Sequence, residues 1–463
     1  MLKVDDLISV RHKAKINFDK LKKKKFHGVS IDSRTIKKNE IFFAIKGERT
    51  DGHNFLDDVF KRRVIIAVVN EDWFSKVGKR YSDKIFFIVE DTTLALGEFS
   101  KIHRSNFNFP VLCIGGSNGK TTTKDLTAAV LSQKFKVLKT EGNFNNHIGL
   151  PLTLLRLNEY HNFCLLEVGC NHFNEIKYLC GIAEPDYGMV TNIGKEHLEF
   201  FKDLTGVAKA EFELFEYLKS RKQATIFFNL DDRFIKKYSA KISYEKKFTY
   251  SYKFDTDVKG RFKGYNKNFE PEIEISYREK EFKTFISTFG KHSIYNGLAA
   301  AAAGLFFKVS QSKIKKALQN FKPSSSKRME ALKVNSMTII NDTYNSNPES
   351  VKMGLETMLD YKTKGEKYAV LSDMLELGKL SKSEHSNIGK LVKKLKVKNL
   401  YTYGKESYNT FYNAGKLKNN FYFDSKEDLI RMLKKNLKPD DVIYVKGSRG
   451  MKMEEVVTGI TEN

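Results

Sequence analysis

Cysteine, proline and long hydrophobic runs are scarce in this chain of 463 residues. The four cysteines form no CxxC pair, which argues against zinc sites and disulfides and favours buried thiols in a reducing compartment. With 7 prolines and 29 glycines, the composition also excludes a fibrous or low-complexity protein. The longest apolar run, at 297–307, is far shorter than the roughly 20 residues of a membrane helix, so we expect a core helix there.

No targeting segment is evident at the start of the chain, MLKVDDLISVRHK. This stretch carries two aspartates and lacks the apolar region of a secretory signal. Together with the cysteine pattern, it leads us to expect a cytoplasmic protein with no membrane partner.

Positive charge is the property that the chain has in excess. Lysine and arginine number 81 against 56 acidic residues, a net charge of +25, which raises the possibility of nucleic-acid binding. The densest lysine group lies at 20–25, but other lysines are spread along the whole chain. A nucleic-acid groove combines concentrated charge with interleaved aromatic residues or a known motif, and we find neither. We therefore expect a solvated lysine-rich surface and no nucleic-acid partner.

Alternating strand-like and helix-like segments predict an α/β protein of about three domains. We expect a small N-terminal α/β domain at 1–108, and a central doubly wound domain with a parallel sheet at 109–322. After a linker at 321–327, a Rossmann-like α/β domain is expected at 323–463. Ligands of such sheets bind beyond the carboxyl ends of the strands. The expected strands are 41–45, 64–69 and 84–89, then 111–114, 163–168 and 187–191, and finally 337–340, 368–371, 400–403 and 442–445.

A glycine-rich segment, GSNGKTT, follows the expected strand 111–114 and opens a helix. Backbone N–H groups of such a turn and of a helix N-terminus bind phosphate oxygens. We predict a P-loop for ATP, with Lys120 on the terminal phosphates and the Thr121 hydroxyl on Mg2+. A chance glycine turn before a lysine is the alternative, and strand, GKTT and helix together disfavour it. The loop residues are Gly116, Ser117, Asn118, Gly119, Lys120, Thr121 and Thr122.

Three further residues carry chemistry that a bound nucleotide needs. Glu167 ends one expected strand, His197 comes shortly after another, and Glu211 lies in a helix-like run. ATP requires Mg2+, which prefers oxygen ligands and few protein groups. A lone histidine is usually a surface or core residue, so the P-loop nearby is what favours a metal role for His197.

These segments together resemble the Mur ligases, the ATP-dependent amide-bond ligases of peptidoglycan precursor synthesis. GGSNGKTTTKDL resembles their ATP loop, and TNIGKEHLEF resembles their magnesium signature. Other segments resemble the branch that adds D-alanyl-D-alanine to UDP-N-acetylmuramoyl-tripeptide, and they occur in order along all three expected domains. These segments are 31–55, 141–155, 167–176, 341–350, 371–378 and 445–454.

The resemblance implies a role for each domain and for the predicted catalytic residues. The first domain would hold the UDP substrate, the second ATP and Mg2+, and the third would close over ATP and bring in the dipeptide. Lys120 corresponds to the phosphate-loop lysine of the family. Thr121 and Glu167 correspond to its first magnesium site, and His197 to a ligand of its second.

Further residues are assigned by the same resemblance. Asn296, Arg328 and Asp342 correspond to residues that contact ATP. For Asn296, a helix-start residue is the alternative, and for Arg328 a linker charge. The residues in segments that line the UDP-sugar-peptide site are Ser33, Arg34, Asn145 and Asn146.

The chain departs from the family at Glu211, where relatives usually carry a lysine that CO2 converts into an anionic magnesium ligand. Lys209 does not replace it, because residues two apart on a helix point to different faces. Glu211 supplies a fixed negative charge, but its side chain is shorter. Direct metal binding, binding through water and no binding are the open alternatives, and our hypothesis is activity that does not depend on bicarbonate.

The implied reaction begins when the tripeptide carboxylate attacks the γ-phosphate of ATP, which gives an acyl phosphate and ADP. The amine of D-alanyl-D-alanine then attacks the acyl carbon, and phosphate leaves. The alternatives are a sister Mur or folate-polyglutamate ligase, a nucleic-acid-binding ATPase and a non-catalytic homologue. We expect a monomer, although the sequence leaves open both the oligomeric state and the third residue of the tripeptide.

Overall fold

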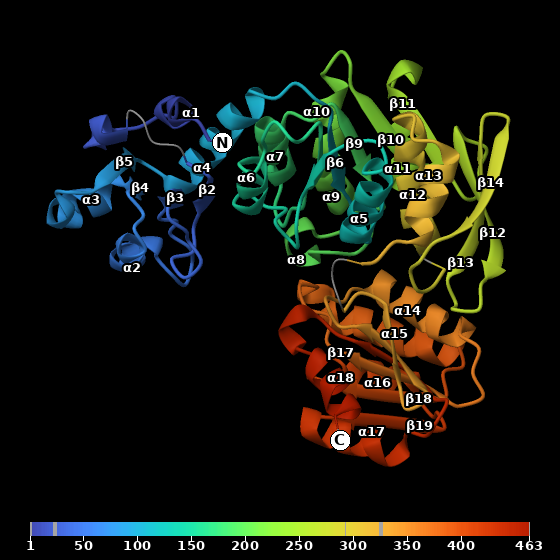
Figure 1. Ribbon diagram of the computed structural model, residues 1–463. Helices are drawn as coiled ribbons and strands as arrows, with labels where there is room; N and C mark the ends of the chain where they lie inside the picture. The colour runs from blue at the N-terminus through green and yellow to red at the C-terminus, as the bar shows by residue number, and fades with distance from the viewer. Residues whose placement is uncertain (1, 22–25, 292, 324–326, 463) are drawn as a thin grey trace. The chain divides into compact units, whose positions relative to one another are not determined.

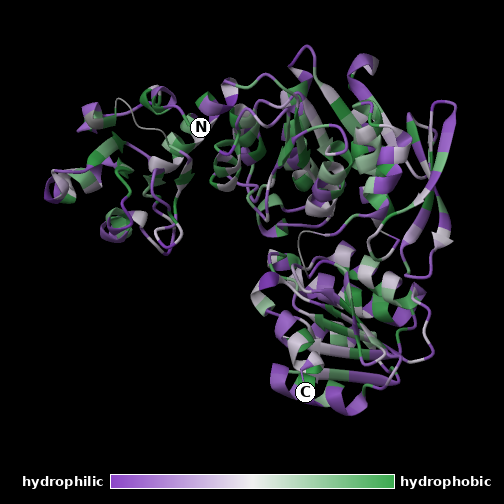
Figure 2. Cartoon of the chain, in the orientation of Figure 1, coloured by the Kyte–Doolittle hydropathy of each residue, from purple (hydrophilic) through white to green (hydrophobic). Residues whose placement is uncertain are grey.

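The computed structural model describes residues 2–21, 26–291, 293–323 and 327–462 (Figure 1). Part of the expected linker and most of the lysine group at 20–25 thus lie outside the described residues. The strands form three sheets, and the predicted α/β class is confirmed. Figure 2 shows hydrophobic residues along the strands of each sheet and hydrophilic residues over the outer helices. In the part of the chain that is described, no helix is long and apolar enough to cross a membrane.

The strands of the N-terminal sheet carry apolar side chains on both faces, and both faces are buried. Ile41 and Phe43 belong to one hydrophobic cluster, whereas Phe42 and Ala44, which alternate with them along the chain, belong to another, because successive strand side chains point to opposite faces. Strand β1 pairs antiparallel with β5, and the other pairs are parallel. In sheet order the strands are β1 (Ala14–Ile16), β5 (Ile85–Val89), β4 (Ile66–Asn70), β3 (Glu40–Phe43) and β2 (Gly28–Ser30). The helices are α1 (Val4–Ile8), α2 (Leu56–Lys61), α3 (Glu71–Val77) and α4 (Thr92–Ser105).

The middle sheet has nine strands, and it is parallel where β7 and β6 flank β8. The three strands expected here are confirmed as β6, β8 and β9. The sheet continues into antiparallel β12, β13 and β14, which the sequence analysis did not predict. In sheet order the strands are β14 (Lys280–Phe285), β13 (Pro271–Tyr277), β12 (Val258–Tyr265), β11 (Lys247–Ser251), β10 (Thr225–Asn229), β9 (Tyr187–Val190), β6 (Val111–Gly115), β8 (Phe163–Glu167) and β7 (Val137–Lys139).

Two helical predictions for this segment have different outcomes. The apolar run at 297–307 is a buried core helix, as expected. The helix-like run that contains Glu211, expected at 207–218, is divided into two helices, the first of which ends at Glu211 and the second of which begins at Glu213. The helices are α5 (Lys120–Leu131), α6 (Gly149–Leu154), α7 (Glu175–Ala183), α8 (Leu198–Phe201), α9 (Leu204–Glu211), α10 (Glu213–Lys219), α11 (Arg233–Ser239), α12 (Ser293–Phe306) and α13 (Gln311–Gln319).

The C-terminal sheet has helices on both faces. Helices α17 and α18 bury one face. Helix α14 contacts β17 and β20, and helix α16 contacts β18 and β19. All strand pairs are parallel except β15 with β16. In sheet order the strands are β15 (Glu330–Val334), β16 (Met337–Asp342), β20 (Val442–Lys446), β17 (Lys367–Ser372), β18 (Asn399–Tyr403) and β19 (Asn419–Phe423). The helices are α14 (Pro348–Asp360), α15 (Ser381–Lys394), α16 (Tyr408–Ala414), α17 (Lys426–Asn436) and α18 (Glu454–Thr461).

The chain forms two compact units. The first contains Met1–Gly115, Lys134–Met189 and Glu213–Ile226, and the second contains Gly116–Gln133, Val190–Phe212 and Phe227–Asn463. The phosphate loop and the C-terminal sheet therefore belong to the same unit. The predicted domain boundaries near 108 and 322 stay a prediction.

All four cysteines are buried, as expected from the sequence, and none of them forms a disulfide among the described residues. Cys113 lies in β6, Cys164 in β8 and Cys180 in α7. Burial raises the pKa of these three thiols above the usual value. They are therefore protonated and act as small apolar side chains of the core.

Candidate nucleotide and ligase site

The phosphate loop connects the end of β6 to the start of α5, as the sequence predicted. Gly116 and Gly119 have φ angles of 115° and 79°, which glycine adopts at little cost. The Ser117 amide donates to the Asn192 carbonyl over 2.9 Å, and the Asn118 amide donates to the Asn192 side chain over 3.0 Å. The turn is thereby fastened to the segment after β9, within the second unit.

Asn296 lies against the phosphate loop, in the first turn of α12. Its side-chain oxygen accepts a hydrogen bond of 3.1 Å from the Thr123 hydroxyl of α5. A Cβ atom on Gly119 would lie 2.5 Å from the same oxygen. Asn296 thus packs directly on the turn. This contact places Asn296 next to the predicted ATP site.

We expect Gly119→Ala to destabilise the protein by about 1–3 kcal/mol, because a side chain disfavours this left-handed backbone and meets Asn296. The affinity for ADP should fall by at least about tenfold, since the loop amides turn away from the phosphates. Urea unfolding and calorimetric titration measure the two effects.

Gly264→Ala is the matched control for the loop variant. Gly264 also has a positive φ, of 135°, but a Cβ atom there meets nothing within 4 Å. It should leave ADP affinity unchanged. Equal losses of affinity in the two variants would show that the turn of the loop is not specific for phosphate.

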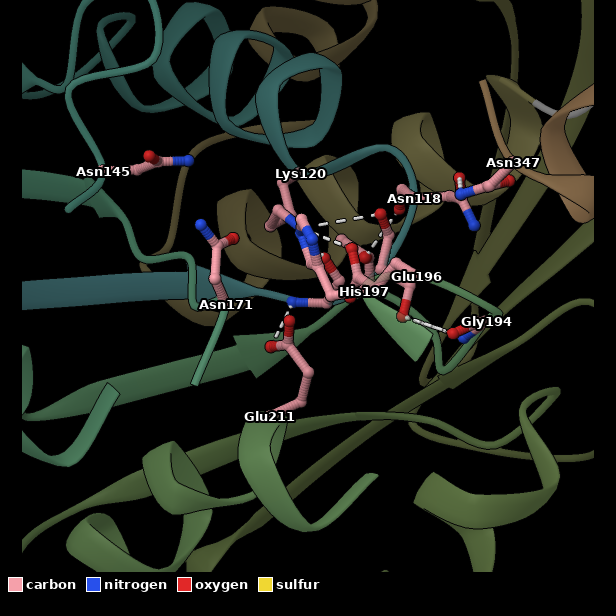
Figure 3. A network of polar contacts seen from close by, with 12 residues as sticks. Asn118, Lys120, Asn145, Asn171, Gly194, Glu196, His197, Glu211 and Asn347 are labelled. Carbon is pink, nitrogen blue, oxygen red and sulfur yellow. Dashed lines mark hydrogen bonds and ion pairs between the residues drawn. The ribbon is translucent and has the colours of Figure 1, made fainter. Parts of the chain in front are cut away.

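Lys120 is held at the loop between backbone carbonyls and an acid (Figure 3). Its ammonium group donates to the carbonyls of Gly116 and Ser117 and lies 3.4 Å from Glu196 Oε2. The side chains of Lys120 and Glu196 are 16% and 11% exposed. A lysine so shielded from water interacts strongly with an anion that arrives at the loop. The sequence analysis did not single out Glu196, although it stands in the quoted signature TNIGKEHLEF.

Glu211 is buried beneath the loop, at the end of α9. Its Oε2 atom accepts a hydrogen bond of 2.6 Å from the Gly116 amide, and its Oε1 atom has no hydrogen-bond partner among the described residues. Burial raises the pKa of Glu211, Lys120 opposes the rise, and Glu196 adds to it. Lys209 is exposed on the same helix, whereas Glu211 is buried, so the two side chains lie on different faces of α9.

We expect the nucleotide-free protein to gain stability from Glu211→Gln as the pH rises. The pKa of Glu211 is raised on folding, so its burial costs nothing below the unfolded value of about 4.5 and costs about 1.4 kcal/mol more per pH unit above it. The free energy of unfolding of the variant, relative to the parent, should rise by about 2 kcal/mol from pH 5.5 to 7.0. Urea unfolding at both pH values tests this, and a difference that does not change with pH contradicts it.

Glu167, Asn145 and Asn146 lie together in the first unit. Glu167 accepts a hydrogen bond of 2.9 Å from the Asn145 amide, and its backbone N–H donates to Thr140. Asn146 accepts from the amides of Ile148 and Gly149 and so caps α6. Asn145 is therefore aimed at the acid, whereas the Asn146 side chain fixes the start of a helix.

His197 precedes α8 in a left-handed backbone conformation, with a φ of 46°. Such strained residues cluster at functional sites. Its Nδ1 atom lies 2.7 Å from Glu376 Oε2 of the C-terminal segment, by which we mean residues 327–462. This contact leaves the opposite nitrogen, Nε2, available for a metal. A histidine that binds a metal through one nitrogen usually donates from the other to a carboxylate.

Arg328 and Asp342 lie in the C-terminal part of the second unit, each with its own partners. The Arg328 guanidinium stacks 3.7 Å from the Tyr344 ring centre. Asp342, at the end of β16, pairs with Lys446 over 2.6 Å and accepts from the Tyr444 hydroxyl over 3.2 Å. Lys446 was not predicted as a site residue. A lysine at the end of the otherwise apolar strand VIYVK is the signal that could have indicated it.

Ser33 and Arg34 lie in the turn after β2, in the first unit. Arg34 is exposed and binds Asp32 with two hydrogen bonds of 2.9 and 2.7 Å. The guanidinium lowers the pKa of Asp32 to about 2. The turn thus displays a fixed arginine, which suits an anionic substrate group.

The donors suit a magnesium ion that is completed by nucleotide phosphates. Glu211 offers a buried carboxylate oxygen without a hydrogen bond, next to the loop. No group of three or more His, Cys, Asp or Glu residues that could hold a metal occurs in the described ranges. Mg2+ usually takes only one or two protein carboxylates beside phosphates and water, so these residues fit such an ion.

Family models match the chain in three places. They are the Mur ligase middle domain at residues 114–304, the Mur ligase glutamate ligase domain at 327–449, and the Mur ligase family catalytic domain at 25–73. The chain belongs to the Mur ligase family.

Curated relatives match over almost the whole chain. A UDP-N-acetylmuramoyl-tripeptide–D-alanyl-D-alanine ligase of Bacillus subtilis is 34% identical, over 94% of this chain and 93% of the relative. The ligase of the same name from Escherichia coli is 31% identical, over 94% of each chain.

Solved structures agree with this assignment. MurF from Acinetobacter baumannii has a TM-score of 0.85 and 25% identity, and covers 95% of this chain and 94% of its own. MurF ligase from Thermotoga maritima, solved in complex with ADP, has a TM-score of 0.81 and 25% identity, and covers 94% and 97%. The three-domain architecture of these ligases is that of this chain.

Proposed function

We propose that this chain is the ATP-dependent ligase that adds D-alanyl-D-alanine to UDP-N-acetylmuramoyl-tripeptide in peptidoglycan precursor synthesis. The observation that carries the proposal is the phosphate loop, which holds Lys120 and lies in one unit with the C-terminal sheet. Asn347, from the quoted segment NDTYNSNPES, donates a hydrogen bond of 2.9 Å to Asn118 of the loop. The segment assigned to the dipeptide branch thus touches the ATP loop.

In the proposed reaction, the loop amides and Lys120 hold the ATP phosphates. The tripeptide carboxylate attacks the γ-phosphorus, the bond to the bridging oxygen breaks, and ADP leaves. The amine of D-alanyl-D-alanine then attacks the acyl carbon, loses a proton, and displaces phosphate. Carboxylate and phosphate repel one another, so Lys120 contributes mainly by neutralising charge and fixing positions.

We propose that Mg2+ accompanies ATP, with Thr121 and Glu167 at one ion and His197 and Glu211 at a second. When bound, the ions would neutralise charge that develops on the transferring phosphate. Glu376 would hold His197 so that its Nε2 atom faces the ion. Asn296, Arg328 and Asp342 are proposed to contact the nucleotide, and Ser33, Arg34, Asn145 and Asn146 the UDP-sugar-peptide.

Phosphate release tests the proposed function directly. Purified protein is incubated with ATP, Mg2+ and UDP-N-acetylmuramoyl-tripeptide, with and without D-alanyl-D-alanine. We expect release to require both substrates, and tripeptides that end in lysine or in meso-diaminopimelate to show which one the enzyme prefers. Release that depends on neither substrate would overturn the proposal. Phosphate release with single amino acids in place of D-alanyl-D-alanine would instead indicate a sister ligase.

We further expect the activity to be independent of bicarbonate, because Glu211 already carries a carboxylate. A CO2-depleted preparation should have the same kcat before and after bicarbonate is added. Glu211→Lys is the matched variant, since it restores the residue type of the relatives. A rise in kcat of the parent enzyme on adding bicarbonate would refute the role of Glu211.

We also propose that the enzyme works as a cytoplasmic monomer. Four buried cysteines, none of which forms a disulfide among the described residues, support a reducing compartment. Light scattering should give the mass of one chain, and the mass of two would contradict the proposal.

A further inference from the structure

Lys195, in the signature segment 193–197, has no part in the proposed chemistry, yet its side chain and its backbone both contact carboxylates. Its ammonium group lies 2.7 Å from Glu384 Oε1. Its backbone N–H donates to Glu349 Oε2 over 3.1 Å. One residue of the signature segment therefore meets two carboxylates of the C-terminal segment, all within the second unit.

The two acids belong to the first turns of two helices. Glu349 is in α14 and Glu384 is in α15, where the positive end of each helix stabilises a negative charge. The Glu384 side chain is only 9% exposed, and that of Lys195 is 31% exposed. A carboxylate so buried is costly without a cation, because water solvates it poorly. Lys195 therefore stabilises the negative charge of Glu384.

Other polar contacts join the same two segments. His197 pairs with Glu376, and the Glu199 amide donates to the Glu376 carbonyl over 3.4 Å. These contacts come from residues that follow Lys195 in the chain, at the start of α8. Glu196, between Lys195 and His197, reaches back to Lys120. Lys195 thus directly precedes Glu196, which pairs with the loop lysine, and His197, which pairs with the C-terminal segment.

We propose that Lys195 is a positioning residue, clasped by Glu349 and Glu384, which holds the signature segment on the C-terminal segment in the geometry needed for catalysis. The clasp is this set of three residues. It acts through Glu196 and His197 and touches neither ATP nor the peptides. Its effect on activity rests on the proposed function, whereas its effect on the segment itself does not.

A double-mutant cycle tests the clasp with Lys195→Met, Glu384→Gln and the double variant. We expect kcat to fall about tenfold in each single variant while the KM for ATP changes less than about threefold. The double variant should be no slower than the slower single variant, because both changes break one contact. Effects that multiply, or a kcat within twofold of the parent in Lys195→Met, would overturn the proposal.

Hydrogen exchange gives a readout that needs no substrate. In Lys195→Met, amides of the peptide that covers 193–199 should exchange at least about tenfold faster, because the segment is released from Glu349 and Glu376. Unchanged exchange would overturn the clasp even if kcat falls. If the parent enzyme has no ligase activity, the proposed function fails, and exchange still decides on the clasp.

Lys418→Met is the matched control. Lys418 forms an ion pair of 2.9 Å with Glu366 and is 58% exposed, and its partner lies outside the signature segment. It should leave kcat within twofold and leave exchange of the 193–199 peptide unchanged. A tenfold loss in this control as well would show that loss of any ion pair in the C-terminal segment has the effect, and would overturn the clasp.

Discussion

Lys120→Met should lower kcat of the ligase reaction by about a thousandfold or more, the scale expected when a preorganised group that stabilises developing charge is removed. The lysine is held at the loop by the carbonyls of Gly116 and Ser117, so its charge needs no rearrangement when ATP arrives. Its loss also leaves Glu196 and Glu211 together without their cation, which disfavours binding of the phosphates. A coupled assay of ADP release measures kcat.

Lys120→Arg is the control for charge as opposed to shape. It keeps the positive charge but replaces a compact ammonium with a planar fork. We expect activity between that of Lys120→Met and that of the parent. A Met variant that keeps more than a tenth of the parental kcat would remove Lys120 from the mechanism.

The second large effect is expected in stability, from Lys446→Met. Lys446 is 2% exposed, and besides Asp342 it donates to the Asn345 carbonyl over 2.8 Å. Removing one partner of a buried ion pair typically costs about 3–5 kcal/mol, because the other charge is left buried without a partner. The C-terminal segment should therefore unfold at a lower urea concentration, which circular dichroism follows.

The single tryptophan makes this measurement selective. Trp73 lies in α3, beside the N-terminal sheet, so its fluorescence should report an unchanged midpoint while the circular dichroism midpoint falls. Lys352→Met removes an exposed ion pair with Glu356 and should cost less than about 1 kcal/mol. Equal losses in both lysine variants would contradict a special role for the buried pair.

Local patterns in the sequence were sufficient for ten of the twenty strands that the structure describes. Apolar runs bounded by glycine or polar residues gave β6, β8 and β9, and the GKTT motif gave the start of α5. The strands β12 to β14 are among those that were missed, because segments such as VKGRFKGY (β12) and KEFKTF (β14) carry many charges, and both strands pair with β13, which lies between them. Their burial comes from α12 and α13, which contact them from later in the chain, and no local pattern shows that.

The site was predictable in its residue types but not in its pairings. Lys120 and Glu211 were identified from motif and resemblance, whereas the hydrogen bond from Gly116 to Glu211 joins residues that are 95 positions apart in the chain. Lys195 and Glu384 are two charged residues among many in the sequence. Only the meeting of α15 with the signature segment distinguishes them.

The buried cysteines have a practical consequence for following motion in this protein. Reagents for thiols attack the thiolate form, and Cys113, Cys164 and Cys180 are both enclosed and protonated. A cysteine introduced at an exposed position such as Lys405 should therefore take up a fluorescent dye well ahead of the native thiols. The wild-type background is ready for single-site labelling, and a dye on the C-terminal segment can report its movement when ATP is added.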